Sequence, residues 1–112
     1  MKYKPIYTEI IEHKKFDDLT IIRESPNNYP KGKSNIYAKN TNNEIIWFAE
    51  LPITGDIYCN SIQWNKNINP NAKNGNEFVV DSSNTFVVAS WNCFTVSINN
   101  INGKILQKEF TK

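Results

Sequence analysis

A short internal repeat constrains the fold of this chain more than any other feature of its sequence. Residues 36–46 read IYAKNTNNEII, and residues 96–106, sixty positions later, read VSINNINGKIL. In both copies an apolar-rich segment runs into an asparagine-rich turn, which a charged residue and two aliphatic residues follow. Asparagine and glycine tolerate the positive φ that tight hairpin turns require. The repeat therefore predicts two β-hairpins with the same pattern, and with them an antiparallel, all-β fold.

The rest of the chain consists of short apolar segments separated by turn residues, without a convincing helical period. At 112 residues it has the length of one domain, which we place at residues 1–112. We expect about eight or nine antiparallel strands, in a meander that forms a curved sheet or a two-layer sandwich. A helix is the alternative structure for the first of them. The expected strands lie at residues 6–12, 19–23, 35–39, 44–50, 56–63, 77–80, 85–90, 94–99 and 104–110.

Two long polar segments, at residues 24–33 and 65–76, carry the prolines, glycines and asparagines that are typical of loops. Trp47 and Trp91 each sit in an apolar run, so we expect both in the core. Trp64 directly precedes the second loop, and a core position and a surface position are equally expected for it. The other positions expected in the interior are Ile21, Ile36, Ile46, Phe86, Val88, Phe94, Val96, Ile98 and Ile105.

The charge pattern argues against nucleic acid as a partner. Thirteen basic and eleven acidic residues give a net charge of +2, they are spread along the chain, and Arg23 is the one arginine. No apolar stretch approaches the length of a membrane span or a secretory leader, so we expect a cytoplasmic protein. Cys59 and Cys93 match no metal or redox spacing, and we expect reduced thiols.

The candidates for catalysis are few and scattered. His13 is the one histidine, and the residues around it form no motif with a nucleophile. Asp17, Asp18 and Asp56 lack the spacing of a metal-binding loop. We therefore expect a non-catalytic protein without a cofactor or a metal site, and keep an enzyme of unrecognised type as an alternative.

Binding is the more promising function, because loops on a rigid β scaffold commonly carry it. The first loop combines a tyrosine between two prolines with nearby lysines, and a tryptophan borders the second loop. These residues, Tyr29, Lys31, Lys33 and Trp64, are our candidates for contact with a partner. Another protein is the expected partner. A small-ligand or glycan-binding domain that uses exposed tryptophans is the alternative.

Two resemblances bear on these expectations. Residues 34–38 with 44–52, and residues 91–99 with 102–106, resemble the blade hairpins of PQQ-like β-propellers. This resemblance implies blade-like hairpins, but two copies cannot close a propeller, and no cofactor-binding residue is implied. Such a meander has open sheet edges, through which a homodimer could form.

The whole chain also resembles small uncharacterised bacterial proteins. The shared motifs are Arg-Glu-Ser-Pro, Lys-Gly-Lys-Ser-Asn-Ile-Tyr, Ile-Trp-Phe-Ala-Glu-Leu-Pro and Glu-Phe-Thr-Lys, here at residues 23–26, 31–37, 46–52 and 109–112. By its size and composition, the chain is also similar to the immunity proteins of bacterial toxin systems. This similarity implies a protein that neutralises a toxin domain by binding it.

Overall fold

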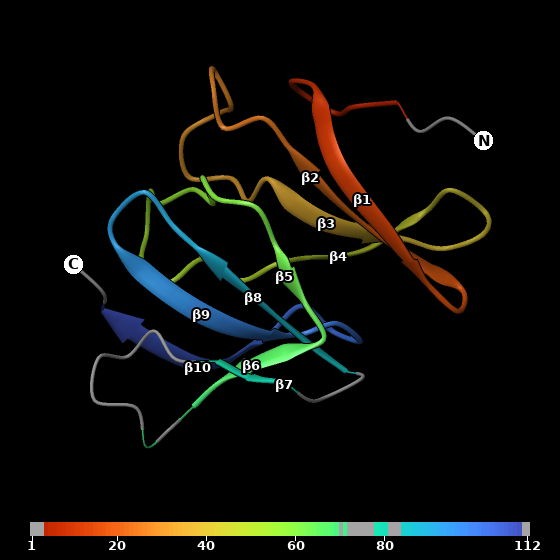
Figure 1. The fold of residues 1–112 in the computed structure, drawn as a ribbon. Helices are drawn as coiled ribbons and strands as arrows, with labels where there is room; N and C mark the ends of the chain where they lie inside the picture. The colour runs from red at the N-terminus through yellow and green to blue at the C-terminus, as the bar shows by residue number, and fades with distance from the viewer. Residues whose placement is uncertain (1–3, 70, 72–77, 81–83, 111–112) are drawn as a thin grey trace.

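The computed structural model describes residues 4–69, 71, 78–80 and 84–110, and this part of the chain is all-β (Figure 1). It contains ten strands in three antiparallel sheets. None of the described residues lies in a helix, so this part holds no helix that could cross a membrane. The strands are β1 (Ile10–Phe16), β2 (Leu19–Glu24), β3 (Ile36–Lys39), β4 (Ile45–Phe48), β5 (Gln63–Trp64), β6 (Lys66–Ile68), β7 (Phe78–Val80), β8 (Thr85–Ala89), β9 (Phe94–Asn99) and β10 (Ile105–Phe110).

The first sheet is a meander in which β1, β2, β3 and β4 pair in chain order. Phe16 pairs with Leu19, so Asp17 and Asp18 alone form the turn between β1 and β2. Asp17 has a φ of 49°, which aspartate tolerates better than most residues. The alternation of half-buried and exposed side chains along β1 is that of a strand. A strand instead of a helix is therefore confirmed in this region, but it spans Ile10–Phe16 and not the predicted residues 6–12.

The second sheet has the order β10-β9-β8-β5. The third sheet is the small pair of β6 and β7, which lies between β5 and β8 in the sequence. The antiparallel all-β fold class is confirmed. The internal repeat occupies equivalent places, because β3–β4 and β9–β10 are the last two strands of their sheets. Asn43 and Gly103, sixty residues apart, both have positive φ in the turns, at 65° and 75°.

The two four-stranded sheets share one hydrophobic core. It includes Ile21 and Ile36 from the first sheet and Phe86 and Val96 from the second. Trp47 is buried as expected. The core residues are Ile21, Ile36, Ala38, Trp47, Ala49, Tyr58, Ile62, Phe86, Val88, Val96 and Ile98, with Phe16, Leu51, Trp64, Phe94 and Ile105 packed against them.

Two core predictions were wrong. Ile46 is 49% exposed, because the β3–β4 pairing shifts register between Ala38 and Lys39 and Trp47 takes the inward position. Trp91 is 73% exposed, because the apolar run of β8 ends at Ala89 and Trp91 lies in the following turn. The apolar runs were read correctly, but the exposure of Ile46 depends on the pairing register and that of Trp91 on where β8 ends.

The strand predicted at residues 56–63 is mostly irregular. Tyr58 forms one isolated bridge with Ser90, and regular pairing with β8 begins only at Gln63. Tyr58 and Ile62 are nevertheless in the core, and Trp64 packs against it. The loop predicted at 65–76 contains β6, while its residues 70 and 72–76 lie outside the described part.

Candidate functional site

The segment before β1 is bound to the first sheet by a buried carboxylate. Glu24, at the end of β2, has no exposed surface. Its two carboxylate oxygens accept hydrogen bonds from the backbone N–H groups of Ile6, Tyr7 and Thr8, at 2.6, 3.0 and 2.9 Å. The Tyr37 hydroxyl donates a further hydrogen bond of 2.5 Å. One side chain therefore determines the path of residues 6–8 across the end of the sheet.

The environment of Glu24 favours its charged form. Burial by itself raises the pKa of a carboxyl group, but the hydrogen bonds from Thr8, Tyr37, Ile6 and Tyr7 outweigh burial and lower the pKa of Glu24. The same contact works in the opposite direction on Tyr37, whose pKa is raised by burial and by the neighbouring carboxylate. The pair is therefore a carboxylate and a neutral phenol.

Tyr7 and Tyr29 form an aromatic pair where residues 4–9 lie beside the loop that follows β2 (Figure 1). Their ring centroids are 5.2 Å apart and the rings meet edge to face, at 79°. Tyr29 is only 7% exposed, and its hydroxyl donates a hydrogen bond of 2.9 Å to the Ser34 carbonyl. Tyr7 is 49% exposed. The buried ring thus supports the exposed one.

Two hollows share Ser34 in their lining, where this loop lies near the end of β4. One, of about 150 Å³, is lined by Tyr7, Lys33, Ser34 and Phe48. The other, of about 480 Å³, includes Ser34 and Ile53 in its lining. We call the five residues Tyr7, Lys33, Ser34, Phe48 and Ile53 the loop-end surface.

The loop-end surface presents fixed apolar groups beside positive charge. Phe48 is 48% exposed and packs on the buried Tyr37, with ring centroids 5.7 Å apart. Ile53 is also exposed, as are Lys31 and Lys33. Aromatic rings backed by a rigid interior lose little conformational freedom when they bind a partner. This arrangement can therefore recognise a surface that offers apolar and acidic groups.

The four candidate contact residues of the sequence analysis do not form one group. Lys33 lines the loop-end surface and Lys31 lies beside it, against Gly55. Tyr29 is buried, so its contribution is to support Tyr7. Trp64 lies at the far end of β1, where it packs between Phe16 and Phe86, with centroid distances of 5.6 and 5.7 Å.

Sequence reasoning missed Tyr7 and Phe48. The signal for Phe48 was present, because Ile46 and Phe48 alternate with Trp47 and Ala49, so that one pair must face away from the core. The signal for Tyr7 was absent from its own segment. Its position depends on Glu24, seventeen residues further along the chain.

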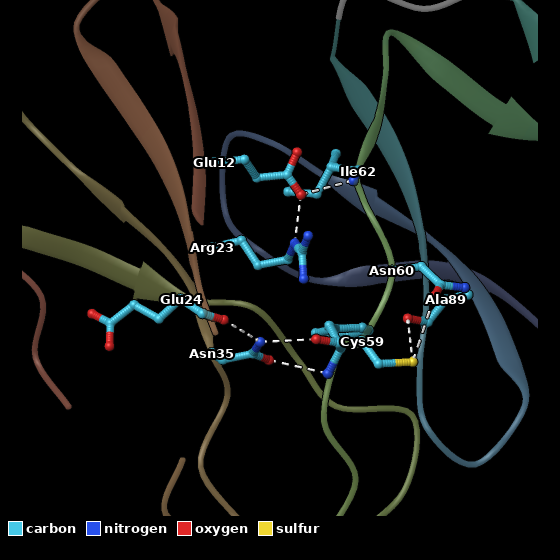
Figure 2. A network of polar contacts seen from close by, with 9 residues as sticks. Glu12, Arg23, Glu24, Asn35, Cys59, Asn60, Ile62 and Ala89 are labelled. Atoms are coloured by element: carbon cyan, nitrogen blue, oxygen red, sulfur yellow. Dashed lines mark hydrogen bonds and ion pairs between the residues drawn. The ribbon is translucent and has the colours of Figure 1, made fainter. Parts of the chain in front are cut away.

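A polar network joins the two four-stranded sheets (Figure 2). Glu12 on β1 accepts hydrogen bonds on one carboxylate oxygen from the buried Arg23, at 2.5 Å, and from the backbone N–H of Ile62, at 2.9 Å. The Asn35 amide donates to the carbonyls of Glu24 and Tyr58 and accepts from the Tyr58 N–H. The backbone N–H groups of Tyr58 and Ile62 therefore bond to side chains of Asn35 and Glu12, while the Cys59 N–H bonds to the Ala89 carbonyl, and the segment does not form a regular strand.

A second carboxylate organises the turn that carries Trp91. Asp56 is buried, and its Oδ1 accepts hydrogen bonds from the backbone N–H of Ile57 and from both the backbone and the side chain of Asn92.

Burial raises the pKa of the nearby Cys59 thiol. Cys59 is half-buried and Cys93 exposed, and neither forms a disulfide.

A third hollow, of about 630 Å³, lies at the opposite end of the molecule, among the turns. Asp17 and Asp18 lie on its wall next to Phe16, and three asparagines contribute amide groups. We call it the turn-end hollow. Its lining residues are Lys15, Phe16, Asp17, Asp18, Leu19, Asn65, Asn84, Asn100 and Ile101.

The described residues contain no group of three or more histidine, cysteine, aspartate or glutamate side chains placed to hold a metal ion. His13 lies on the exposed face of β1.

Comparisons of the chain with protein-family models, curated proteins and solved structures found no match. The interpretation of these surfaces therefore rests on their own residues.

Proposed function

We propose that this protein is a non-catalytic protein-binding module that contacts its partner through the loop-end surface. The observation that carries the proposal is the pair of half-exposed rings, Tyr7 and Phe48, each packed on a buried tyrosine. Binding energy at protein interfaces is concentrated in a few well-supported residues, and aromatic side chains are prominent among them. Exposed apolar groups beside a hollow are also the usual mark of an interaction surface.

The charges indicate what kind of partner this surface fits. Lys31 and Lys33 are exposed next to the two hollows. A partner that places carboxylates opposite these lysines and an apolar side chain between Tyr7 and Phe48 would complement both features. Its association should weaken as the salt concentration rises, because exposed charges are screened.

The particular form that we propose is an immunity protein, which neutralises a bacterial toxin domain by occupying it. The size of the chain and its resemblance to such proteins support this narrower proposal. It predicts a stoichiometric complex that abolishes the activity of the toxin. If the captured partner is toxic when expressed alone and harmless when expressed with this chain, the narrower proposal is supported.

The test begins with a tagged pull-down from the lysate of the native host, read by mass spectrometry, and continues with affinity measurements on the captured protein. Phe48→Ala, Tyr7→Ala and Lys33→Glu should each weaken binding by about tenfold or more. Leu106→Ala is the matched control, because Leu106 is an exposed apolar residue on β10, outside this surface. Equal affinity for all four variants and the unmodified chain would contradict our choice of surface.

Binding of a small polar ligand, such as a glycan, is the second candidate function. The turn-end hollow favours it, because carboxylates, amides and an apolar wall together suit sugar hydroxyls and ring faces. Of the three tryptophans, Trp91 is exposed, while Trp64 packs against Phe16 on the wall of this hollow. A titration with a panel of saccharides, followed by tryptophan fluorescence, tests this function. Asp18→Ala should abolish any response that arises in the hollow.

A further inference from the structure

The strand β1 is an open edge of the first sheet. It is seven residues long and pairs with β2 on one side only (Figure 1). The opposite edge of this sheet is partly covered, because the Glu50 N–H, just beyond β4, donates to the Gly103 carbonyl at 2.9 Å. Proteins either protect a long open edge or use it for pairing.

The sequence of β1 is complementary to itself when two copies run antiparallel. A two-fold axis at His13 places Glu12 of each copy opposite Lys14 of the other. Glu12, Lys14 and Phe16 share one face of the strand, whereas the register shift between Ile10 and Glu12 turns Ile10 to the other face. Opposite charges directly across two strands stabilise their pairing.

Two side chains of this face are already partly immobilised by contacts within the single chain. Lys14 Nζ lies over the rings of Phe16 and Trp64, 5.7 and 5.8 Å from their centroids. Both contacts of the Glu12 carboxylate are made by one oxygen, Oε1 (Figure 2). Pairing would therefore immobilise few side chains that are mobile in the single chain.

The strand β10, one of the two edge strands of the second sheet, lacks this property. A two-fold axis through any residue from Ile105 to Phe110 places no carboxylate of β10 opposite a lysine of β10. An axis at Lys108 would instead bring two lysines face to face, and like charges directly opposite are destabilising. The charge pattern thus distinguishes β1 from β10.

We propose that two copies of this chain form a dimer by antiparallel pairing of β1 about a two-fold axis at His13. The two first sheets then become one continuous sheet. His13 of one copy lies opposite His13 of the other. The dimer does not depend on the function of the loop-end surface, because no residue of that surface belongs to β1.

The test is the molecular mass in solution, measured by sedimentation over a range of protein concentrations. The unmodified chain should approach twice its monomer mass of 13.0 kDa as the concentration rises. His13→Asp places two carboxylates at the axis, and Lys14→Glu places a carboxylate against Glu12 of the second copy. Each should weaken the dimer about tenfold or more.

Two variants serve as controls. His13→Thr introduces a neutral β-branched residue at the same position and should keep the dimer. Lys108→Glu makes a similar charge change on β10 and should also keep it. Circular dichroism verifies that every variant is folded. A chain that remains monomeric at all concentrations, or a dimer that His13→Asp and Lys14→Glu leave intact, would overturn the proposal.

Discussion

Gly103, in the turn of the second hairpin, lies directly against the indole ring of Trp47 in the first. A Cβ atom at Gly103 would stand 2.5 Å from Cε3 and 2.8 Å from Cδ2 of that ring. The Gly103 carbonyl also accepts the hydrogen bond from Glu50, just beyond β4. The two copies of the internal repeat are therefore packed on each other, and glycine is required where they meet.

This contact predicts that Gly103→Ala destabilises the protein by about 2–5 kcal/mol. The φ of 75° costs an alanine roughly 1–2 kcal/mol, and the overlap with Trp47 adds about 1–3 kcal/mol. Urea unfolding at neutral pH measures the loss. Gly32→Ala is the matched control, because Gly32 has a φ of 84° with nothing within 4 Å of its Cβ position. Equal losses in the two variants would show that the indole contact is unimportant.

The buried Glu24 predicts a dependence of stability on pH. Its pKa is lowered in the folded protein, so the stabilisation is complete above the ordinary carboxyl pKa of 4.5 and is lost as the pH falls through the lowered value. Glu24→Gln should cost about 2–3 kcal/mol at pH 7, because bonds to a charged acceptor are lost. Urea unfolding at decreasing pH should show the difference between the two proteins shrinking. A constant difference would contradict this explanation.

The ion pair joins the buried Arg23 to the half-buried Glu12, and we expect its two halves to be strongly coupled. Glu12→Leu leaves the Arg23 guanidinium without its carboxylate and removes the acceptor of the Ile62 N–H, at a cost of about 3–5 kcal/mol. The double variant Glu12→Leu with Arg23→Met should recover much of that loss. A double-mutant cycle by urea unfolding tests this coupling. Additive losses would show that the pair acts as two independent residues.

The three tryptophans should report different environments. Trp91 is 73% exposed, so Trp91→Phe should remove most of the fluorescence that iodide quenches and change stability by less than about 0.5 kcal/mol. Trp47 is buried against Gly103, and Trp47→Ala should cost about 3–5 kcal/mol. Iodide quenching and urea unfolding of the two variants test the assignment. Protection of Trp91 from iodide in the unbound protein would contradict it.

Local patterns predicted the elements that depend on neighbouring residues. The Asn-rich and Gly-containing turns predicted both repeated hairpins, and the alternation through Phe94, Val96 and Ile98 predicted a strand with one buried face. The prediction failed at residues 56–63. That segment is as apolar as a strand, but Asn35 and Glu12 supply the partners for the backbone of Tyr58 and Ile62, which interrupts regular pairing with β8.

The candidate site was predicted less well than the fold. Lys31 and Lys33 were found because loop composition is visible in the sequence, and Tyr29 was found without any sign that it is buried. Tyr7 was missed, because its exposure depends on a contact with a residue in another part of the chain. A surface is made of side chains that a particular packing leaves outside, and composition does not specify that packing.

By itself, the sequence determined the fold class, the hairpins and most of the interior. These features follow from turn residues and from apolar alternation, which act over a few positions of the chain. Only the tertiary structure decided that Trp91 is exposed, that Ile46 faces outward and that Glu24 binds residues 6–8. These outcomes depend on register and on contacts between distant residues, such as Trp47 and Gly103. The energy of such contacts appears only when the two sheets have closed over their shared core.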